Sequence, residues 1–206
     1  MRLFAAWLAA CALLPDAALL AGCSRGPTLP RLEANDVILA FGDSLTYGTG
    51  ASAEQSYPAV LETLVHRRVV REGYPGETTA QGLERLPELL DRYHPRLLLL
   101  CMGGNDMLQQ VDAGTIAANL RRMIDMARER GAAVLLIGVP APQLLGGAAP
   151  LYRALAEAQR IPLEEETLSS VLHQRAYKSD PIHPNAEGYR LLAQALADLL
   201  RHSGAV

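Results

Sequence analysis

The chain contains few cysteines and few aromatic side chains. Only three of its 206 residues are cysteine, and two of these, Cys11 and Cys23, lie close to the N-terminus. Cys101 is the one thiol in the remainder of the chain, so no disulfide framework is expected there. Because Cys101 lies in an apolar run, we expect it to be a small core residue rather than a nucleophile.

Basic residues are also scarce. The 19 Lys and Arg are outnumbered by 22 Asp and Glu and form no stripe, which argues against a nucleic-acid partner. The sequence has no phosphate-binding loop, no dinucleotide fingerprint and no cluster of metal ligands, so we expect neither a cofactor nor a metal. A chain of this length and hydrophobic content is enough for one domain with a full core, which we expect to be a monomer.

The N-terminus has the pattern of an export signal. Arg2 precedes a continuous apolar segment, residues 3–14, that is too short to span a bilayer. The Leu-Ala-Gly-Cys sequence that ends at Cys23 resembles the lipobox of bacterial lipoproteins. This resemblance implies that Cys23 becomes the lipidated first residue of the mature chain. An ordinary secretory signal, cleaved at nearby small residues, is the alternative.

On either alternative we expect an exported protein of the bacterial cell envelope. Residues 1–23 would be the signal peptide and lipobox, residues 24–34 a linker, and residues 35–204 the folded domain. A lipid on Cys23 would anchor the protein to a membrane. Ser24 stands where some lipoproteins carry Asp, and by the same resemblance this favours the outer membrane, facing the periplasm.

Apolar runs alternate with amphipathic segments from residue 36 onward. We expect strands at residues 37–41, 69–70, 96–102, 133–139 and 161–163, and helices at residues 57–68, 80–93, 112–130, 151–159 and 186–202. Pro87 should kink or split the second helix. This alternation predicts an α/β fold, a three-layer α/β/α sandwich of flavodoxin type with a parallel sheet of about five strands.

A serine follows the first of these strands. The sequence Gly-Asp-Ser-Leu at positions 42–45 places Ser44 at the carboxyl end of a buried strand, where open α/β sheets bind ligands. Ser44 is therefore a candidate nucleophile. The alternative is that these residues form a turn and that Ser44 caps a helix.

A serine hydroxyl needs a base and a carboxylate to become a good nucleophile. The sequence Asp-Pro-Ile-His at positions 180–183 supplies both, and its spacing lets Asp180 and His183 share one turn. This turn follows the last strand, so it should reach the same edge of the sheet as Ser44. The other histidines outside the signal lack such a carboxylate, and we expect them to be solvated surface residues: His66, His94, His173 and His202.

The same edge offers donors for a developing oxyanion. Ser44 has a backbone N–H, Gly76 has no side chain to keep substrate away from its N–H, and Asn105 has a side-chain amide. Taken one at a time, Gly76 could instead serve a turn and Asn105 a cap. Together with Ser44, Asp180 and His183 they favour a site.

Four blocks in this order resemble those of the SGNH (GDSL) hydrolases. They are Gly-Asp-Ser-Leu at 42–45, the glycines at 73 and 76, Gly-Gly-Asn-Asp at 103–106 and Asp-Pro-Ile-His-Pro-Asn at 180–185. The chain is most similar to the TesA-type thioesterase I, lysophospholipase L1 and arylesterase group. This resemblance implies Ser44 as nucleophile, His183 as base, Asp180 as its orienting carboxylate, and Ser44, Gly76 and Asn105 as the oxyanion hole. In the second block Arg71 and Pro75 depart from the residues that relatives often carry.

The expected function is hydrolysis of carboxylic esters through an acyl-serine intermediate. Small acyl or aryl esters, lysophospholipids and acyl thioesters all fit this machinery. Removal of acetyl groups from an envelope glycan is an alternative, and a binding lipoprotein without activity is a weaker one. Residues 140–150 should form an irregular loop and one wall of the acyl pocket, with small apolar side chains that favour short to medium chains.

Overall fold

Five parallel strands form a single sheet at the centre of the protein. The computed structural model describes residues 27–141 and 147–206, so the predicted signal and Cys23 lie outside the described residues. The strand order is β2-β1-β3-β4-β5. The strands are β1 (Val37–Gly42), β2 (Arg68–Gly73), β3 (Leu97–Cys101), β4 (Ala133–Ile137) and β5 (Leu163–Glu164). The predicted three-layer sandwich with a flavodoxin-like sheet is confirmed.

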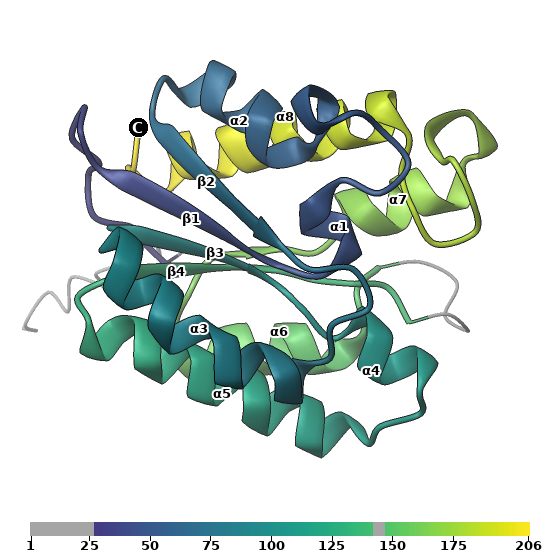
Figure 1. Cartoon of the computed structure of the whole chain (residues 1–206), viewed down its shortest axis with the longest axis horizontal. Coiled ribbons are helices and arrows are strands. Elements are labelled where there is room, and N and C mark those ends of the chain that lie inside the picture. Colours follow the sequence, from purple (N-terminus) through teal and green to yellow (C-terminus); the bar gives the residue numbers. More distant parts are fainter. Residues whose placement is uncertain (1–26, 142–146) are drawn as a thin grey trace, which may run out of the picture.

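Helices cover both faces of this sheet (Figure 1). One layer contains α2 (Tyr57–Val65), α7 (Thr167–His173) and α8 (Ala186–His202), and the other contains α3 (Thr79–Tyr93), α5 (Ala113–Glu129) and α6 (Pro150–Gln159). Two short helices, α1 (Ser44–Tyr47) and α4 (Gly104–Leu108), follow β1 and β3 directly. Parallel strands all point the same way, so α1 and α4 lie at one carboxyl edge of the sheet.

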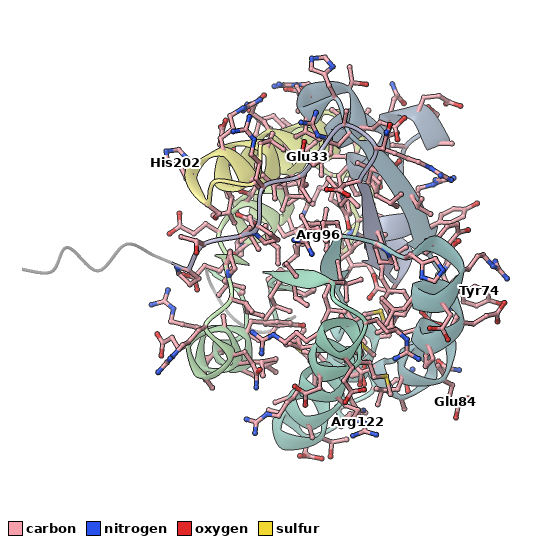
Figure 2. All side chains as sticks on the ribbon, turned by 90° about the vertical axis from the view of Figure 1, so that its left-hand side faces the viewer. Glu33, Tyr74, Glu84, Arg96, Arg122 and His202 are labelled. Carbon is pink, nitrogen blue, oxygen red and sulfur yellow. The ribbon has the colours of Figure 1, made fainter. Side chains whose placement is uncertain are left out.

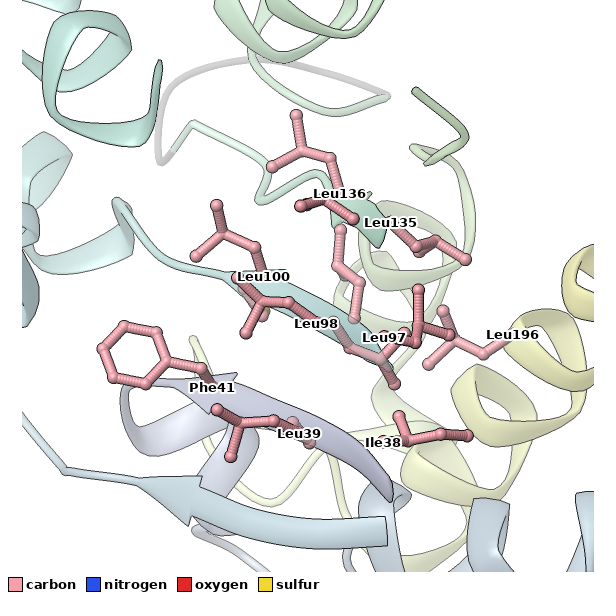
Figure 3. Packing of buried hydrophobic residues seen from close by; sticks show 14 of the residues in the cluster. Ile38, Leu39, Phe41, Leu97, Leu98, Leu100, Leu135, Leu136 and Leu196 are labelled. Carbon is pink, nitrogen blue, oxygen red and sulfur yellow. The ribbon is translucent and has the colours of Figure 1, made fainter. Parts of the chain in front are cut away.

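The core is built around the strands β1 and β3. The side chains of β1 from Ile38 onward and all those of β3 are buried, because helices cover both faces. Figure 3 shows Leu98 and Leu100 beside Phe41 and Leu39, with Leu196 of α8 packed against the other end. Cys101, the last residue of β3, is fully buried and forms no disulfide. Its predicted place in the core is confirmed.

Helix α3 differs from the expectation. Thr78 caps the helix by accepting a hydrogen bond from the Gln81 N–H. Pro87 does not split the helix, which is continuous from Thr79 to Tyr93. Leu86 and Leu90 are both fully buried, one on either side of the proline, so packing against the sheet holds the two parts together.

The ends of other helices and strands also differ from the expectation. The helix expected over 57–68 ends at Val65, because His66 takes a left-handed conformation with φ of 51°. Strand β2 is longer than the two residues expected, and β5 begins two residues later than expected. The short helices α1, α4 and α7 had no apolar period long enough to be predicted.

Part of the segment that we expected to be a linker packs on the domain. Leu29 and Leu32 are buried. Their N–H groups donate to the carbonyls of Ser203 and Ala205 at 2.9 and 2.8 Å. Figure 2 looks onto this amino edge of the sheet, where Glu33 and Arg96 lie. The described chain thus begins at the edge opposite to α1 and α4.

Candidate active site

Ser44 is the first residue of α1, directly after the end of β1. The turn between them is tight: a Cβ at Gly42 would collide with the Cys101 carbonyl and the Thr46 hydroxyl. Asp43 caps α1 by accepting a hydrogen bond from the Leu45 N–H at 3.0 Å. The Ser44 N–H is left without a partner among the residues that the structure describes.

His183 and Asp180 reach Ser44 from the turn before α8. His183 Nε2 lies 2.9 Å from Ser44 Oγ, and His183 Nδ1 lies 2.7 Å from Asp180 Oδ2. The other carboxylate oxygen of Asp180 accepts the N–H groups of Ile182 and His183, both at 2.9 Å. The chain therefore brings together the three residues that the sequence singled out, in the order hydroxyl, imidazole, carboxylate.

The pKa of Asp180 is lowered from its usual range. Partial burial alone would raise it, but the hydrogen bond from the His183 side chain and the N–H groups of Ile182 and His183 favour the ionised form. An ionised Asp180 holds Nδ1 of His183 protonated, so that Nε2 is free to accept the proton of Ser44.

Within the described residues, none of the remaining histidines forms a hydrogen bond with Ser44 or Asp180. His66 and His94 end α2 and α3 in left-handed conformations. His173 and His202 face the backbone carbonyls of Ser169 and Asp198 through their Nδ1 atoms, and both side chains are exposed.

Gly76 and Asn105 come from the exits of β2 and β3. Gly76 has a φ of 82°, a left-handed conformation that favours glycine, and nothing within 4 Å would meet a Cβ there. Its N–H has no partner among the described residues. Asn105 Nδ2 lies 2.9 Å from the Glu77 carbonyl and 3.3 Å from Asp43 Oδ2. The Asn105 amide therefore contacts the neighbours of both Gly76 and Ser44 in the chain.

Asp43 is a buried carboxyl group that our reading of the sequence did not single out. Burial raises its pKa to about 7; the hydrogen bond from the Leu45 N–H opposes this, and the nearby carboxylates of Glu77 and Asp106 add to it. Its oxygens contact Leu45 and Asn105. Its position beside Ser44 was the one feature of the sequence that could have drawn attention to Asp43. A turn motif does not show, however, that an acidic residue in it is buried.

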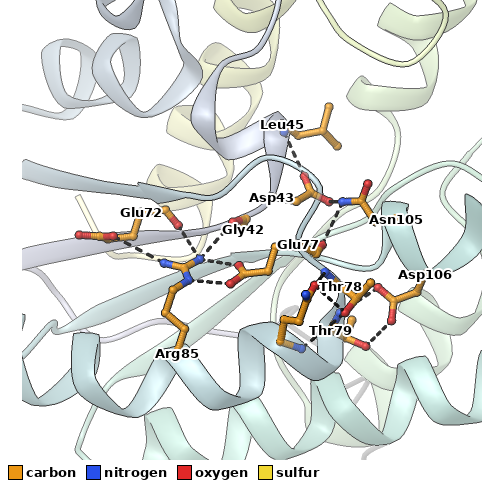
Figure 4. Close-up of polar contacts among 11 residues, drawn as sticks. Gly42, Asp43, Leu45, Glu72, Glu77, Thr78, Thr79, Arg85, Asn105 and Asp106 are labelled. Atoms are coloured by element: carbon orange, nitrogen blue, oxygen red, sulfur yellow. Dashed lines mark hydrogen bonds and ion pairs between the residues drawn. The ribbon is translucent and has the colours of Figure 1, made fainter. Parts of the chain in front are cut away.

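Asp106 is a second buried carboxyl group beside the site that the sequence reading passed over. It accepts the N–H and the hydroxyl of Thr79 at 2.8 and 2.6 Å, and so ties the start of α3 to α4. Asn119 of α5 donates to the same hydroxyl at 2.9 Å. Figure 4 shows Asp106 and Thr79 beside Asn105 and Asp43.

A small pocket of about 170 Å³ opens beside Ser44's helix. Asp43 and Asn105 give it a polar end, and the other lining residues are mostly apolar: Leu45, Gly104, Leu108, Val139, Pro140, Ala141, Leu172, His173, Pro181 and Ile182. Leu108 and Ala141 also border a larger apolar groove of about 690 Å³. Of the loop expected at 140–150, residues 142–146 lie outside the described chain, so only Ala141 and its described neighbours can be placed against the pocket.

The chain matches the GDSL-like lipase/acylhydrolase family over residues 40–191. It belongs to that family. It is 32% identical to an arylesterase of Vibrio mimicus, over 82% of this chain and 91% of that protein. It is 31% identical to the thioesterase 1/protease 1/lysophospholipase L1 of Escherichia coli, over 83% of this chain and 86% of that protein.

Solved structures agree with this assignment. The crystal structure of TesA superposes with a TM-score of 0.72 at 28% identity, covering 81% of this chain and 98% of that one. AlinE4, an SGNH-hydrolase family esterase, superposes with a TM-score of 0.65 at 32% identity, covering 82% and 97%. The resemblance to SGNH hydrolases is confirmed, and the chain is an esterase of the GDSL/SGNH type. No helix within residues 27–141 and 147–206 is long and apolar enough to cross a membrane.

Proposed function

We propose that this GDSL/SGNH hydrolase cleaves small acyl esters through an acyl intermediate on Ser44. The observation that supports the proposal is the unbroken line of contacts from Ser44 Oγ to His183 Nε2 and from His183 Nδ1 to Asp180, at 2.9 and 2.7 Å. A hydroxyl so placed can lose its proton as it attacks.

In the first half of the reaction, Ser44 Oγ attacks the carbonyl carbon while His183 Nε2 takes the hydroxyl proton. The carbonyl oxygen becomes an oxyanion that accepts from the N–H groups of Ser44 and Gly76 and from Asn105 Nδ2. The longer of the two Asn105 contacts, 3.3 Å to Asp43, is the one that an oxyanion would replace. His183 then gives its proton to the departing alcohol or thiol.

In the second half, water takes the place of the alcohol. His183 removes a proton from the water, whose oxygen attacks the acyl carbon, and the collapse of the second oxyanion returns a proton from His183 to Ser44 Oγ. The acid leaves and the free enzyme is restored. Asp180 remains ionised throughout and stabilises the imidazolium of His183.

The test of this assignment is Ser44→Ala. We expect kcat for p-nitrophenyl acetate to fall by about 10⁴-fold or more, because the attacking atom is gone. Ser170→Ala, which removes an exposed hydroxyl on α7, is the matched control and should leave kcat unchanged. Near-normal turnover by the purified Ser44→Ala protein would remove Ser44 from the mechanism.

For the acyl group we propose a preference for short to medium chains. The supporting feature is the small volume of the pocket beside Asn105 and its apolar lining. Each methylene that the pocket accepts adds about 0.8 kcal/mol, so kcat/KM should rise with chain length and then level off. A steady rise from acetate to palmitate would contradict this and point to the groove beyond Leu108. Activity confined to an acetylated glycan would favour the glycan deacetylase instead.

We also propose that the protein is exported and anchored through a lipid on Cys23, in the outer membrane and facing the periplasm. The supporting feature is the Leu-Ala-Gly-Cys sequence at 20–23 after a short apolar segment. Wild-type protein should fractionate with membranes and incorporate labelled palmitate, and Cys23→Ala should do neither. A mature chain that begins at any other residue would contradict the anchor.

A further inference from the structure

Arg85 of α3 forms a forked ion pair just behind the Gly76 turn. Its Nε and Nη2 lie 2.7 and 2.6 Å from the two carboxylate oxygens of Glu77 (Figure 4). The Glu77 side chain is only 5% exposed and that of Arg85 is 23% exposed. A carboxylate this deeply buried is costly without a partner, so Arg85 is what allows Glu77 to lie there charged. The fork also fixes the direction of the Glu77 side chain.

The same guanidinium contacts the ends of two strands. Nη2 lies 3.4 Å from the Gly42 carbonyl and 3.3 Å from the Glu72 carbonyl. Nη1 lies 3.5 Å from the Glu72 carboxylate, whose other oxygen accepts the Tyr93 hydroxyl at 2.7 Å. The guanidinium also stacks on the Phe41 ring, 4.4 Å from its centre. Arg85 and Tyr93, which lie on different turns of α3, therefore link the carboxyl ends of β1 and β2.

Two of the residues that Arg85 contacts lie close in the chain to proposed oxyanion donors. Gly42 precedes Ser44 by two residues, and Glu77 directly follows Gly76. The Glu77 carbonyl in turn accepts from Asn105 Nδ2 at 2.9 Å. Gly76 has no side chain to pack against its surroundings, and a Cβ there would meet no atom within 4 Å. The fork on Glu77, the next residue in the chain, is therefore placed to fix the direction of the Gly76 N–H.

We propose that Arg85 and Glu77 are positioning residues that align the three oxyanion donors of Ser44, Gly76 and Asn105. The proposal rests on the proposed function of these donors. It requires the fork and not merely the positive charge, because only a planar guanidinium can bond both oxygens of Glu77 while also reaching the Gly42 and Glu72 carbonyls. Neither residue touches the substrate.

The first test is Arg85→Lys, which keeps the charge and removes the fork. We expect kcat for p-nitrophenyl acetate to fall by about 10- to 100-fold, with KM within about threefold of the wild-type value. Misplaced donors stabilise the transition state less well but change substrate binding little. The matched control is Arg153→Lys, since Arg153 forms a similar fork with Glu165, both contacts at 3.0 Å, and touches none of the residues named above. This control should keep wild-type kcat.

Glu77→Gln gives a second, independent variant of the same contact. The Gln side chain has one oxygen, so it can accept only one of the two hydrogen bonds that Arg85 donates to Glu77. We therefore expect kcat to fall, as in Arg85→Lys. The decision can rest on this variant if Arg85→Lys does not fold, as judged by the thermal midpoint. Wild-type kcat in a folded Arg85→Lys or Glu77→Gln protein would overturn the proposal.

A double-mutant cycle separates positioning from a general loss of stability. If Arg85 acts through the donors, Arg85→Lys should cost clearly less in an Asn105→Ala background than in the wild type. Fully additive losses would overturn the proposal. Ser44→Ala in the same assay distinguishes failure of the proposed function from failure of the positioning role. If Ser44→Ala stays active, the proposed function is wrong. If Ser44→Ala is inactive but Arg85→Lys behaves like Arg153→Lys, only the positioning role is wrong.

Discussion

The two halves of the site are built in opposite ways. The histidine turn, residues 178–184, is local and partly exposed: Asp180 and His183 are three residues apart, and their side chains are 43% and 13% exposed. The donor cluster, which comprises Asp43, Glu77, Arg85, Asn105 and Asp106, is largely buried and collects residues from the turns after β1 and β2 and from α3 and α4. The histidine turn places the proton acceptor His183 on a loop. The donor cluster instead surrounds the proposed oxyanion donors with buried polar groups that belong to the core of the fold.

The carboxylates in the two halves respond to their surroundings in opposite directions. Hydrogen bonds to the turn lower the pKa of Asp180 against its partial burial, whereas full burial raises the pKa of Asp43 to about 7. A residue on the histidine turn should therefore matter for turnover and little for folding. A residue in the donor cluster should matter for both. The predictions below test this difference.

The largest effect should come from His183→Ala. Without the base, kcat should fall by about 10⁴-fold or more. The free energy of unfolding should change by only about 1 kcal/mol, because the hydrogen bonds of this side chain within the described residues are those to Ser44 and Asp180, on a local turn. Activity assays and urea denaturation measure the two quantities. His202→Ala, on an exposed residue near the end of α8, is the control, and a loss of stability specific to His183→Ala would show that the turn is structural.

The next effect concerns the pH dependence of stability. The folded state binds the Asp43 proton more tightly than the unfolded chain, because its pKa is raised from 3.8 to about 7. The stability that this group contributes is therefore complete below 3.8 and is lost as the pH rises through about 7. The loss should amount to about 4 kcal/mol in wild type.

Asp43→Asn removes this titration while it keeps the shape of the side chain. The difference in unfolding free energy between wild type and Asp43→Asn should therefore shift across that pH window in favour of the variant. Urea denaturation at a series of pH values measures it. Parallel curves for the two proteins would mean that Asp43 stays ionised in the folded state.

The smallest effect compares two aspartates that bind a threonine in the same way. Asp106 and Asp112 each accept both the N–H and the hydroxyl of a threonine, Thr79 and Thr115 respectively, but only the first pair is buried. Asp106→Ala leaves two buried donors unpaired and should lower the free energy of unfolding by about 3 kcal/mol. Asp112→Ala removes an exposed helix cap and should lower it by about 1 kcal/mol. Equal losses, measured by urea denaturation, would argue that burial adds nothing at Asp106.

The contrast also explains how much could be predicted from the sequence. The fold followed from apolar runs, and the contacts among Ser44, His183 and Asp180 followed from one strand exit and a local spacing. Their roles, with those of Gly76 and Asn105, remain predictions. Arg85 and Glu77 were not found, because their importance depends on where α3 lies over the sheet and not on any motif. Short helices such as α7 and the path of the chain through Pro87 likewise depend on tertiary packing.

The first described residues lie at the edge of the sheet opposite to the site. Leu29 and Leu32 are fixed at the amino edge of the sheet, opposite to Ser44. Cys23 precedes Leu29 by six residues, which span roughly 20 Å at full extension. A lipid on Cys23 would therefore hold the amino edge against its membrane and turn the pocket away from it. Such an enzyme would meet molecules arriving from the aqueous compartment before the lipids of its own leaflet.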